Sequence, residues 1–133
     1  MADRDPEPES LDLQILIVSG PEAPEKAVLG LAAALSAVHS AMAVRVVFAM
    51  RGAVWCAATE GNSVLVPGYP PIGELIANLV EEGVAVRGCS SCVDQYCPAE
   101  RDDAGLIKLR AGIGYEGLSA VTLMMSSTNT VTF

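Results

Sequence analysis

Positive charge and aromatic side chains are scarce in this sequence. Its 133 residues contain eight Lys and Arg against sixteen Asp and Glu, a formal net charge of −8, and Phe, Trp and Tyr together make up 5%. Proteins that bind nucleic acid through its phosphates depend on clustered Lys and Arg, so we expect no nucleic-acid partner. The P-loop motif for phosphate binding is also absent, and we expect no nucleotide-binding site.

Signals for secretion and for membrane insertion are missing as well. Residues 1–10 are acidic and carry prolines, without the basic and apolar regions of a secretory signal. We expect them to form a flexible arm, and we expect a cytoplasmic protein whose thiols stay reduced. The apolar stretch Ala27–Met50 is long enough to span a membrane, but Ala27–Ala41 favours a helix and Val44–Phe48 favours a strand. A helix followed by a buried strand explains this stretch better, and we expect no membrane partner.

Hydrophobic residues make up 51% of the chain, enough to build the core of one domain over residues 11–133. Apolar runs typical of buried strands alternate with segments typical of helices. This alternation predicts an α/β fold with a mostly parallel sheet of about five strands and helices on both faces. The predicted strands are Leu11–Val18, Ala43–Met50, Val84–Arg87, Leu109–Ile113 and Asn129–Phe133. The predicted helices are Pro24–Met42, Ile72–Glu82 and Glu116–Met125, with short helical segments at Ala53–Thr59, after Cys92 and at Asp102–Leu109.

Three of the four cysteines form a Cys-x-x-Cys-x4-Cys cluster, namely Cys89, Cys92 and Cys97. The strand Val84–Arg87 is predicted to end just before this cluster, and ligands gather at the carboxyl ends of parallel strands. The next helix would begin near Ser90 or Ser91, where backbone N–H groups favour a negatively charged sulfur. Gly88 would let the chain turn and leave the sulfur uncrowded. We therefore expect Cys89 to be an accessible, reactive thiol.

Three chemistries use cysteines at this spacing. Cys89 and Cys92 match the spacing of redox motifs that exchange thiols with disulfides. A zinc site needs four ligands, so the cluster would also need Cys56 or His39. A second Cys-x-x-Cys pair is missing, and we assign neither a metal nor another cofactor. Sulfur transfer needs only one nucleophilic thiolate in each subunit, which Cys89 would supply.

Four stretches of the sequence follow one another in a familiar order. ILIVSG precedes an alanine-rich helix, and VRVVFAM leads to Gly52; ELIANLVEEGVAVRGCSSC then joins a helix, a strand and a cysteine, and LSAVTLMMSSTNTVTF closes the chain. In this order they resemble the DsrE-like family of small sulfur-relay proteins. The resemblance extends from Leu13 to Phe133.

The resemblance implies a flavodoxin-like three-layer sandwich that assembles into homo-oligomers, trimers or hexamers. It implies that Cys89 carries sulfur as a persulfide, that Cys92 is the second cysteine of some members, and that sulfur donor and acceptor proteins are partners. The residues expected to bind around the sulfur are Gly88, Ser90, Ser91, Trp55 and Arg87. The alternative is a non-catalytic oligomeric module of the same fold that regulates or binds a small ligand.

Overall fold

The computed structural model describes residues 11–133; the arm predicted for residues 1–10 lies outside this range. Strands and helices alternate along most of the chain, as the pattern of apolar residues predicts. In chain order the elements are β1 (Leu13–Ile17), α1 (Pro24–His39), β2 (Val44–Phe48), the 3₁₀ helix η2 (Met50–Cys56), α2 (Ile72–Glu81), β3 (Ala85–Cys89), α3 (Ser90–Tyr96), β4 (Ile113–Glu116), α4 (Leu118–Ser127) and β5 (Asn129–Thr132).

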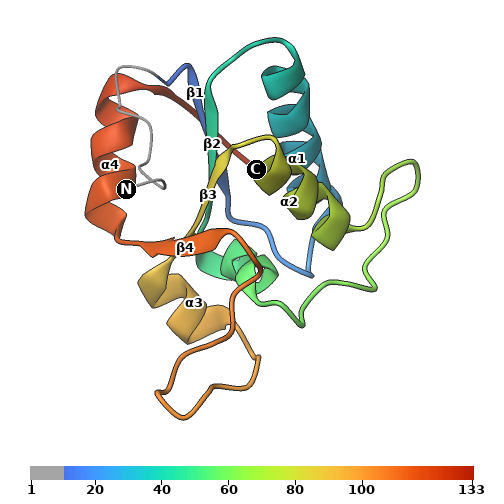
Figure 1. The fold of residues 1–133 in the computed structure, drawn as a ribbon, viewed down its shortest axis with the longest axis vertical. Coiled ribbons are helices and arrows are strands. Elements are labelled where there is room, and N and C mark those ends of the chain that lie inside the picture. The colour runs from blue at the N-terminus through green and yellow to red at the C-terminus, as the bar shows by residue number, and fades with distance from the viewer. Residues whose placement is uncertain (1–10) are drawn as a thin grey trace.

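The five strands form one sheet in the order β4-β3-β2-β1-β5, and every neighbouring pair is parallel. Figure 1 shows α1 and α2 on one face of the sheet and α4 on the other, which confirms the predicted α/β fold class. Because all strands point the same way, their carboxyl ends share one edge, where η2 and α3 pack together. Within residues 11–133, no helix is both long enough and apolar enough to cross a membrane.

The face of the sheet under α1 and α2 is apolar. Ile15, Val46 and Val86 are paired across neighbouring strands and are fully buried on this face. The helix α2 meets them with side chains at helical spacing, including Ile76 and Leu79, which are also buried. Since removing apolar area from water is the main favourable term in folding, this layer forms the core.

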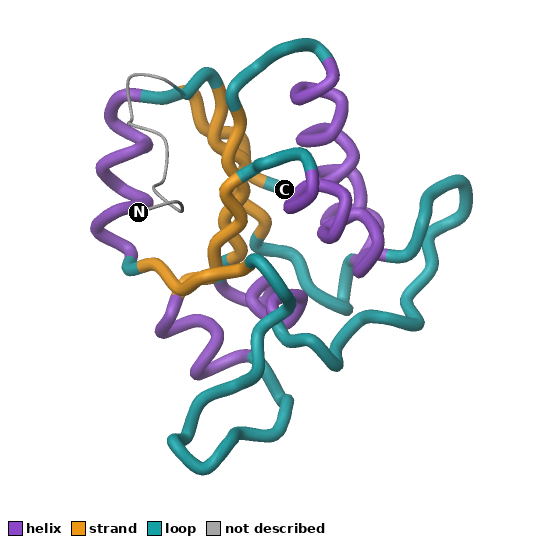
Figure 2. Tube along the Cα trace, in the orientation of Figure 1, coloured by secondary structure: helices purple, strands orange, loops and turns teal. Residues whose placement is uncertain are grey.

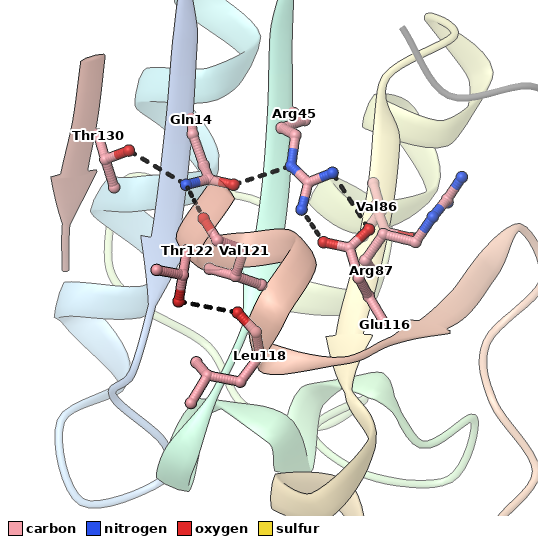
Figure 3. Close-up of polar contacts among 9 residues, drawn as sticks. All are labelled: Gln14, Arg45, Val86, Arg87, Glu116, Leu118, Val121, Thr122 and Thr130. Atoms are coloured by element: carbon pink, nitrogen blue, oxygen red, sulfur yellow. Dashed lines mark hydrogen bonds and ion pairs between the residues drawn. The ribbon is translucent and has the colours of Figure 1, made fainter. Parts of the chain in front are cut away.

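The opposite face, under α4, carries a buried row of polar side chains (Figure 3). The Gln14 side-chain amide donates to Thr130 Oγ1 over 3.1 Å and to the backbone oxygen of Val121. Its oxygen accepts a hydrogen bond of 2.9 Å from Arg45 Nε. Arg45 is 1% exposed and forms a bidentate ion pair with Glu116. Buried charges are tolerated when paired and hydrogen-bonded in this way, so this face is joined by directional bonds.

The helix predicted over Asp102–Leu109 is wrong. The segment is a tight turn, seen as part of the loop below α3 in Figure 2. The Asp102 carboxylate accepts hydrogen bonds of 2.9 Å from the backbone N–H groups of Ala104 and Leu106, which is the local bonding by which Asp favours turns. Gly105 adopts a left-handed φ of +79°, which ends any helical path.

The last strand before α4 also begins later than predicted. The predicted strand Leu109–Ile113 is replaced by β4, which starts at Ile113, and α4 begins two residues beyond its predicted start. Gly112 has φ of +85°, a conformation that an ordinary strand does not use. A Cβ atom at this position would also meet the Val80 side chain at 2.4 Å, so this glycine forms the bend that leads into β4.

Candidate functional site

Cys89 is the last residue of β3, at the carboxyl ends of the strands. The strand runs two residues further than predicted because Gly88 and Cys89 still pair with Tyr115 and Glu116 of β4. The helix α3 begins at the next residue, Ser90, so Cys89 itself takes the N-cap position expected of a serine. The predicted junction of strand, cysteine and helix is present: the strand ends two residues later than expected, and the helix begins at Ser90 as expected.

Hydrogen-bond donors surround the sulfur of Cys89. Its Sγ atom lies 3.6 Å from the hydroxyl oxygen of Ser91. Burial raises the pKa of the Cys89 thiol, but hydrogen bonds from the Cys92 and Ser91 side chains and from their backbone N–H groups outweigh burial and lower this pKa below its ordinary value. Donors that bond the charged form of a group favour that form. The site therefore favours a thiolate at Cys89.

Cys92 has the opposite character. Burial and its hydrogen bond to Cys89 raise the pKa of the Cys92 thiol, although the backbone N–H of Met50 partly offsets this. Met50 begins η2 with a left-handed φ of +50°, a conformation that costs energy for a residue with a side chain. The two cysteines therefore form an unequal pair, in which the pKa of Cys89 is lowered and the pKa of Cys92 is raised.

The expectation of an accessible sulfur is wrong for the single chain. Cys89 is 3% exposed, and Cys92 is 9% exposed. Gly88 does not leave free space at the strand end; it allows close packing, because a Cβ atom there would lie 2.7 Å from the sulfur of Cys56 and 3.3 Å from the Val93 side chain. A reagent reaches the Cys89 sulfur only after a local displacement of the residues that cover it.

Cys56 and Cys97 are buried beside this pair. Burial, and next the charge of Cys97, raise the pKa of the Cys56 thiol far above its ordinary value. Burial also raises the pKa of Cys97, despite a backbone hydrogen bond from Ala99. Both thiols are therefore poor nucleophiles at neutral pH.

The zinc alternative lacks a ligand set in the part of the chain that the structure describes. Across residues 11–133, no three His, Cys, Asp or Glu side chains lie in an arrangement that would hold a metal ion. His39 ends α1 at the opposite edge of the sheet, where its side chain is 65% exposed and 3.9 Å from Glu82.

The other predicted binding residues are in three different environments. Ser90 and Ser91 are exposed at the start of α3. Arg87 is half-buried on the α4 side of the sheet, where it donates to the Val86 backbone oxygen over 3.0 Å. Trp55, expected to line a pocket, is fully buried in the core and donates through Nε1 to the Ser19 backbone oxygen over 2.8 Å. Ser90 and Ser91 are thus the predicted binding residues that combine exposure with a position beside the sulfur.

An unpredicted groove of about 450 Å³ opens beside Cys89. It lies between α3 and the turn of residues 101–107, with β4 behind them. Its walls include Ser90, Ser91 and Asp94 of α3, Arg101 and Leu106 of the turn, and Tyr115 of β4. The groove escaped prediction because it depends on a turn that the sequence pattern favours as a helix.

The segment Gly112–Gly117 has the spacing G-x-G-x-x-G, which the expectation of no nucleotide site overlooked. In dinucleotide-binding folds this motif follows a strand and cradles the pyrophosphate at the start of a helix. Here Gly114 lies inside β4, and Gly117 alone separates β4 from α4. The glycines therefore form no phosphate-binding loop.

Comparison with known proteins agrees with this fold. The model of the DsrE/DsrF-like family matches residues 13–133, and the chain belongs to this family. The crystal structure of the ychN protein from E. coli is similar, with a TM-score of 0.68 and 20% sequence identity over 92% of this chain and 99% of that chain. At this identity the likeness shows the fold alone. A comparison with curated proteins finds no match.

Proposed function

We propose that the protein is a sulfur carrier or sulfurtransferase in which Cys89 accepts a sulfane sulfur and passes it on. The observation that carries this proposal is the set of hydrogen-bond donors around Cys89, with the Ser91 hydroxyl 3.6 Å from the sulfur, which lowers the pKa of this thiol while the pKa values of the other three are raised. The thiolate is the form of cysteine that reacts as a nucleophile. Membership of the DsrE/DsrF-like family supports the same chemistry.

In the loading step, the Cys89 thiolate attacks the outer sulfur of a donor persulfide. A sulfur–sulfur bond forms at Cys89, the sulfur–sulfur bond of the donor breaks, and the donor leaves as a thiolate. No net oxidation occurs, because the sulfane sulfur moves between two thiols. The Ser91 hydroxyl, 3.6 Å from Cys89 Sγ, is placed to donate to the charged sulfur before attack.

Two outcomes are open to the persulfide. An acceptor thiolate that attacks its outer sulfur receives the sulfur and restores the Cys89 thiol. Attack by Cys92 on the inner sulfur instead forms a Cys89–Cys92 disulfide and releases hydrogen sulfide, which takes the proton. Because its pKa is raised, Cys92 is a slow nucleophile at neutral pH, which favours transfer to the acceptor.

We also propose a homo-oligomer, a trimer or hexamer, with α4 in the interface between copies. Leu118, Leu123 and Met125 of α4 are 65%, 63% and 42% exposed. Several exposed apolar side chains on one helix are typical of a face that is covered in the assembly. The four free thiols fit a reducing compartment such as the cytoplasm.

Intact-mass measurement after treatment with inorganic polysulfide tests the carrier function. The wild type should gain the mass of one sulfur atom, Cys89→Ala should gain none, and Cys56→Ala should behave as the wild type because Cys56 is fully buried. Equal uptake by the wild type and Cys89→Ala would show that Cys89 is not the carrier.

One observation favours the alternative, a non-catalytic module of the same fold. Cys89 is 3% exposed in the single chain, as is usual for a packing cysteine. If the wild type takes up no sulfur and its cysteines resist alkylation in the native state, the alternative holds.

A further inference from the structure

The groove beside Cys89 is built by contacts that fix the 101–107 turn against α3 and β4. Arg101 Nη1 lies 3.0 Å from the Asp94 carboxylate, and Arg101 Nη2 donates to the Asp94 backbone oxygen over 2.8 Å. On the other side, the Tyr115 hydroxyl lies 3.4 Å from the Ile107 backbone oxygen. These contacts fix the turn against α3 and β4, and a space of about 450 Å³ lies between these elements.

Ser91 lies between the groove and the sulfur of Cys89. Ser91 lines the groove, and its hydroxyl is 3.6 Å from Cys89 Sγ. Gly88 pairs in the sheet with Tyr115, which lines the opposite wall. A ligand in the groove would therefore lie against the Ser91 side chain, and its reactive end would reach the sulfur once the residues that cover Cys89 are displaced.

The chemistry of the lining indicates the kind of ligand. Leu106 is 53% exposed and forms an apolar wall, and Ser90 and Ser91 offer hydroxyl groups. At one rim, Arg101 and Asp94 present opposite charges that remain 38% and 61% exposed. A volume of this size is within the range of small-molecule sites, and adjacent opposite charges complement a zwitterion.

We propose that the groove binds the persulfide of a small zwitterionic organic thiol, either cysteine or a short cysteine-containing peptide, and that this persulfide loads Cys89 with sulfur. This inference rests on the proposed carrier function and names its substrate class. The ammonium of the ligand faces Asp94, its carboxylate faces Arg101, and its persulfide end faces Ser91. The Cys89 thiolate takes the outer sulfur and the small thiolate leaves, so atoms and charge balance without a further oxidant.

The test compares three sulfur sources on the wild-type protein by the rate of persulfide formation at Cys89. Cysteine persulfide carries both charges, the persulfide of 2-mercaptoethanol carries neither, and inorganic polysulfide has no organic part. We expect cysteine persulfide to load Cys89 about tenfold faster than the 2-mercaptoethanol persulfide, the effect of roughly 1.4 kcal/mol of added interaction. Both should be compared at equal concentration and pH.

Two variants test the groove directly. Leu106→Trp fills the groove, and Asp94→Asn removes one charge while the backbone oxygen of Asp94 still binds Arg101. Each should abolish most of the preference for cysteine persulfide and leave loading by inorganic polysulfide within about twofold of the wild type. Leu65→Trp is the matched control, because Leu65 is 68% exposed in the loop between η2 and α2 and should change neither rate.

The possible results separate the two proposals. No loading by polysulfide in the wild type would overturn the carrier function itself. Loading by polysulfide without a preference for cysteine persulfide, or equal slowing of every source by Leu106→Trp, would overturn the groove as a binding site and leave the carrier function standing.

Discussion

The backbone of Gly88 packs directly against the sulfur of Cys56. A Cβ atom on Gly88 would lie 2.7 Å from Cys56 Sγ, closer than the side chains can pack. The contact joins the end of β3 to η2, one residue before Cys89. The position of Cys89 is therefore coupled to the packing of a thiol that takes no part in the proposed chemistry.

Gly88→Ala should destabilise the protein by about 1–3 kcal/mol, the usual effect of extra volume in a close-packed core. Chemical denaturation followed by circular dichroism measures the difference. Gly114→Ala is the matched control in the neighbouring strand, because its Cβ would meet the Arg87 side chain at an ordinary 3.6 Å. Equal stability of the two variants would contradict the packing account.

Ser91→Ala should raise the pKa of Cys89. The hydroxyl of Ser91 is one of the donors that lower this pKa, so its loss weakens the charged form of the sulfur. The rate of alkylation at Cys89, measured against pH by peptide mass spectrometry, gives the pH midpoint of thiol ionisation independently of how exposed the thiol is. The midpoint should move to higher pH in Ser91→Ala and stay unchanged in Ser90→Ala. An unchanged midpoint in Ser91→Ala would remove the hydroxyl from the account.

Arg45→Leu should cost about 3–5 kcal/mol of stability, because it leaves Glu116 buried without its ion-pair partner. The double variant Arg45→Leu/Glu116→Leu should recover most of that loss, since it removes both charges. Urea denaturation of the two variants and the wild type gives the comparison. A double variant no more stable than Arg45→Leu would show that the ion pair is not the source of the loss.

The protein should lose stability above about pH 9, the ordinary pKa of a thiol, because Cys56 is held protonated. The pKa of Cys56 is raised in the folded state, so its contribution to the free energy of unfolding is fully present below the pKa of a thiol in the unfolded chain. Above that value the contribution declines as pH rises, by up to about 1.4 kcal/mol per pH unit. The raised pKa values of Cys92 and Cys97 change the stability in the same direction, and the lowered pKa of Cys89 changes it in the opposite direction. Unfolding free energies from pH 8 to pH 10 should fall more steeply in the wild type than in Cys56→Ala. Equal slopes would contradict a buried, protonated Cys56.

Leu123→Asp should dissociate the proposed oligomer. Leu123 is 63% exposed on α4, and a carboxylate there would be desolvated in an interface between copies. Size-exclusion chromatography with light scattering should give a smaller mass for this variant and an unchanged mass for Leu65→Asp. A monomeric wild type would exclude the oligomer altogether.

The architecture could be predicted from the sequence because it depends on local patterns. Val44–Phe48 reads as a buried strand, and all five of its residues are buried. The glycine that follows α2, Gly83, has φ of +84°, as expected for a helix stop. The junction of strand, Cys89 and helix was predictable for the same reason, since it involves residues adjacent in sequence.

The groove and the burial of Cys89 could not be predicted, because both depend on contacts between distant segments. The 101–107 turn forms through the Asp102 carboxylate and its backbone contacts, which compete with the helical pattern in the same residues. The ion pair of Arg45 with Glu116 joins positions 71 residues apart, and nothing local in either segment indicates the other. Cys89 is buried where α3 and η2 pack together at the end of β3.

The buried polar row under α4 also fixes how the strands align. Side chains alternate between the two faces of a sheet, so a shift of one residue in β1 or β2 would turn Gln14 and Arg45 toward the apolar layer of α1 and α2. Such a shift would separate Arg45 from Glu116 and strand a charge in the core. The bonds among these three side chains thus exclude misaligned pairings of the sheet and, because Glu116 pairs with Cys89 in the ladder, keep the strand that carries Cys89 in register with β4.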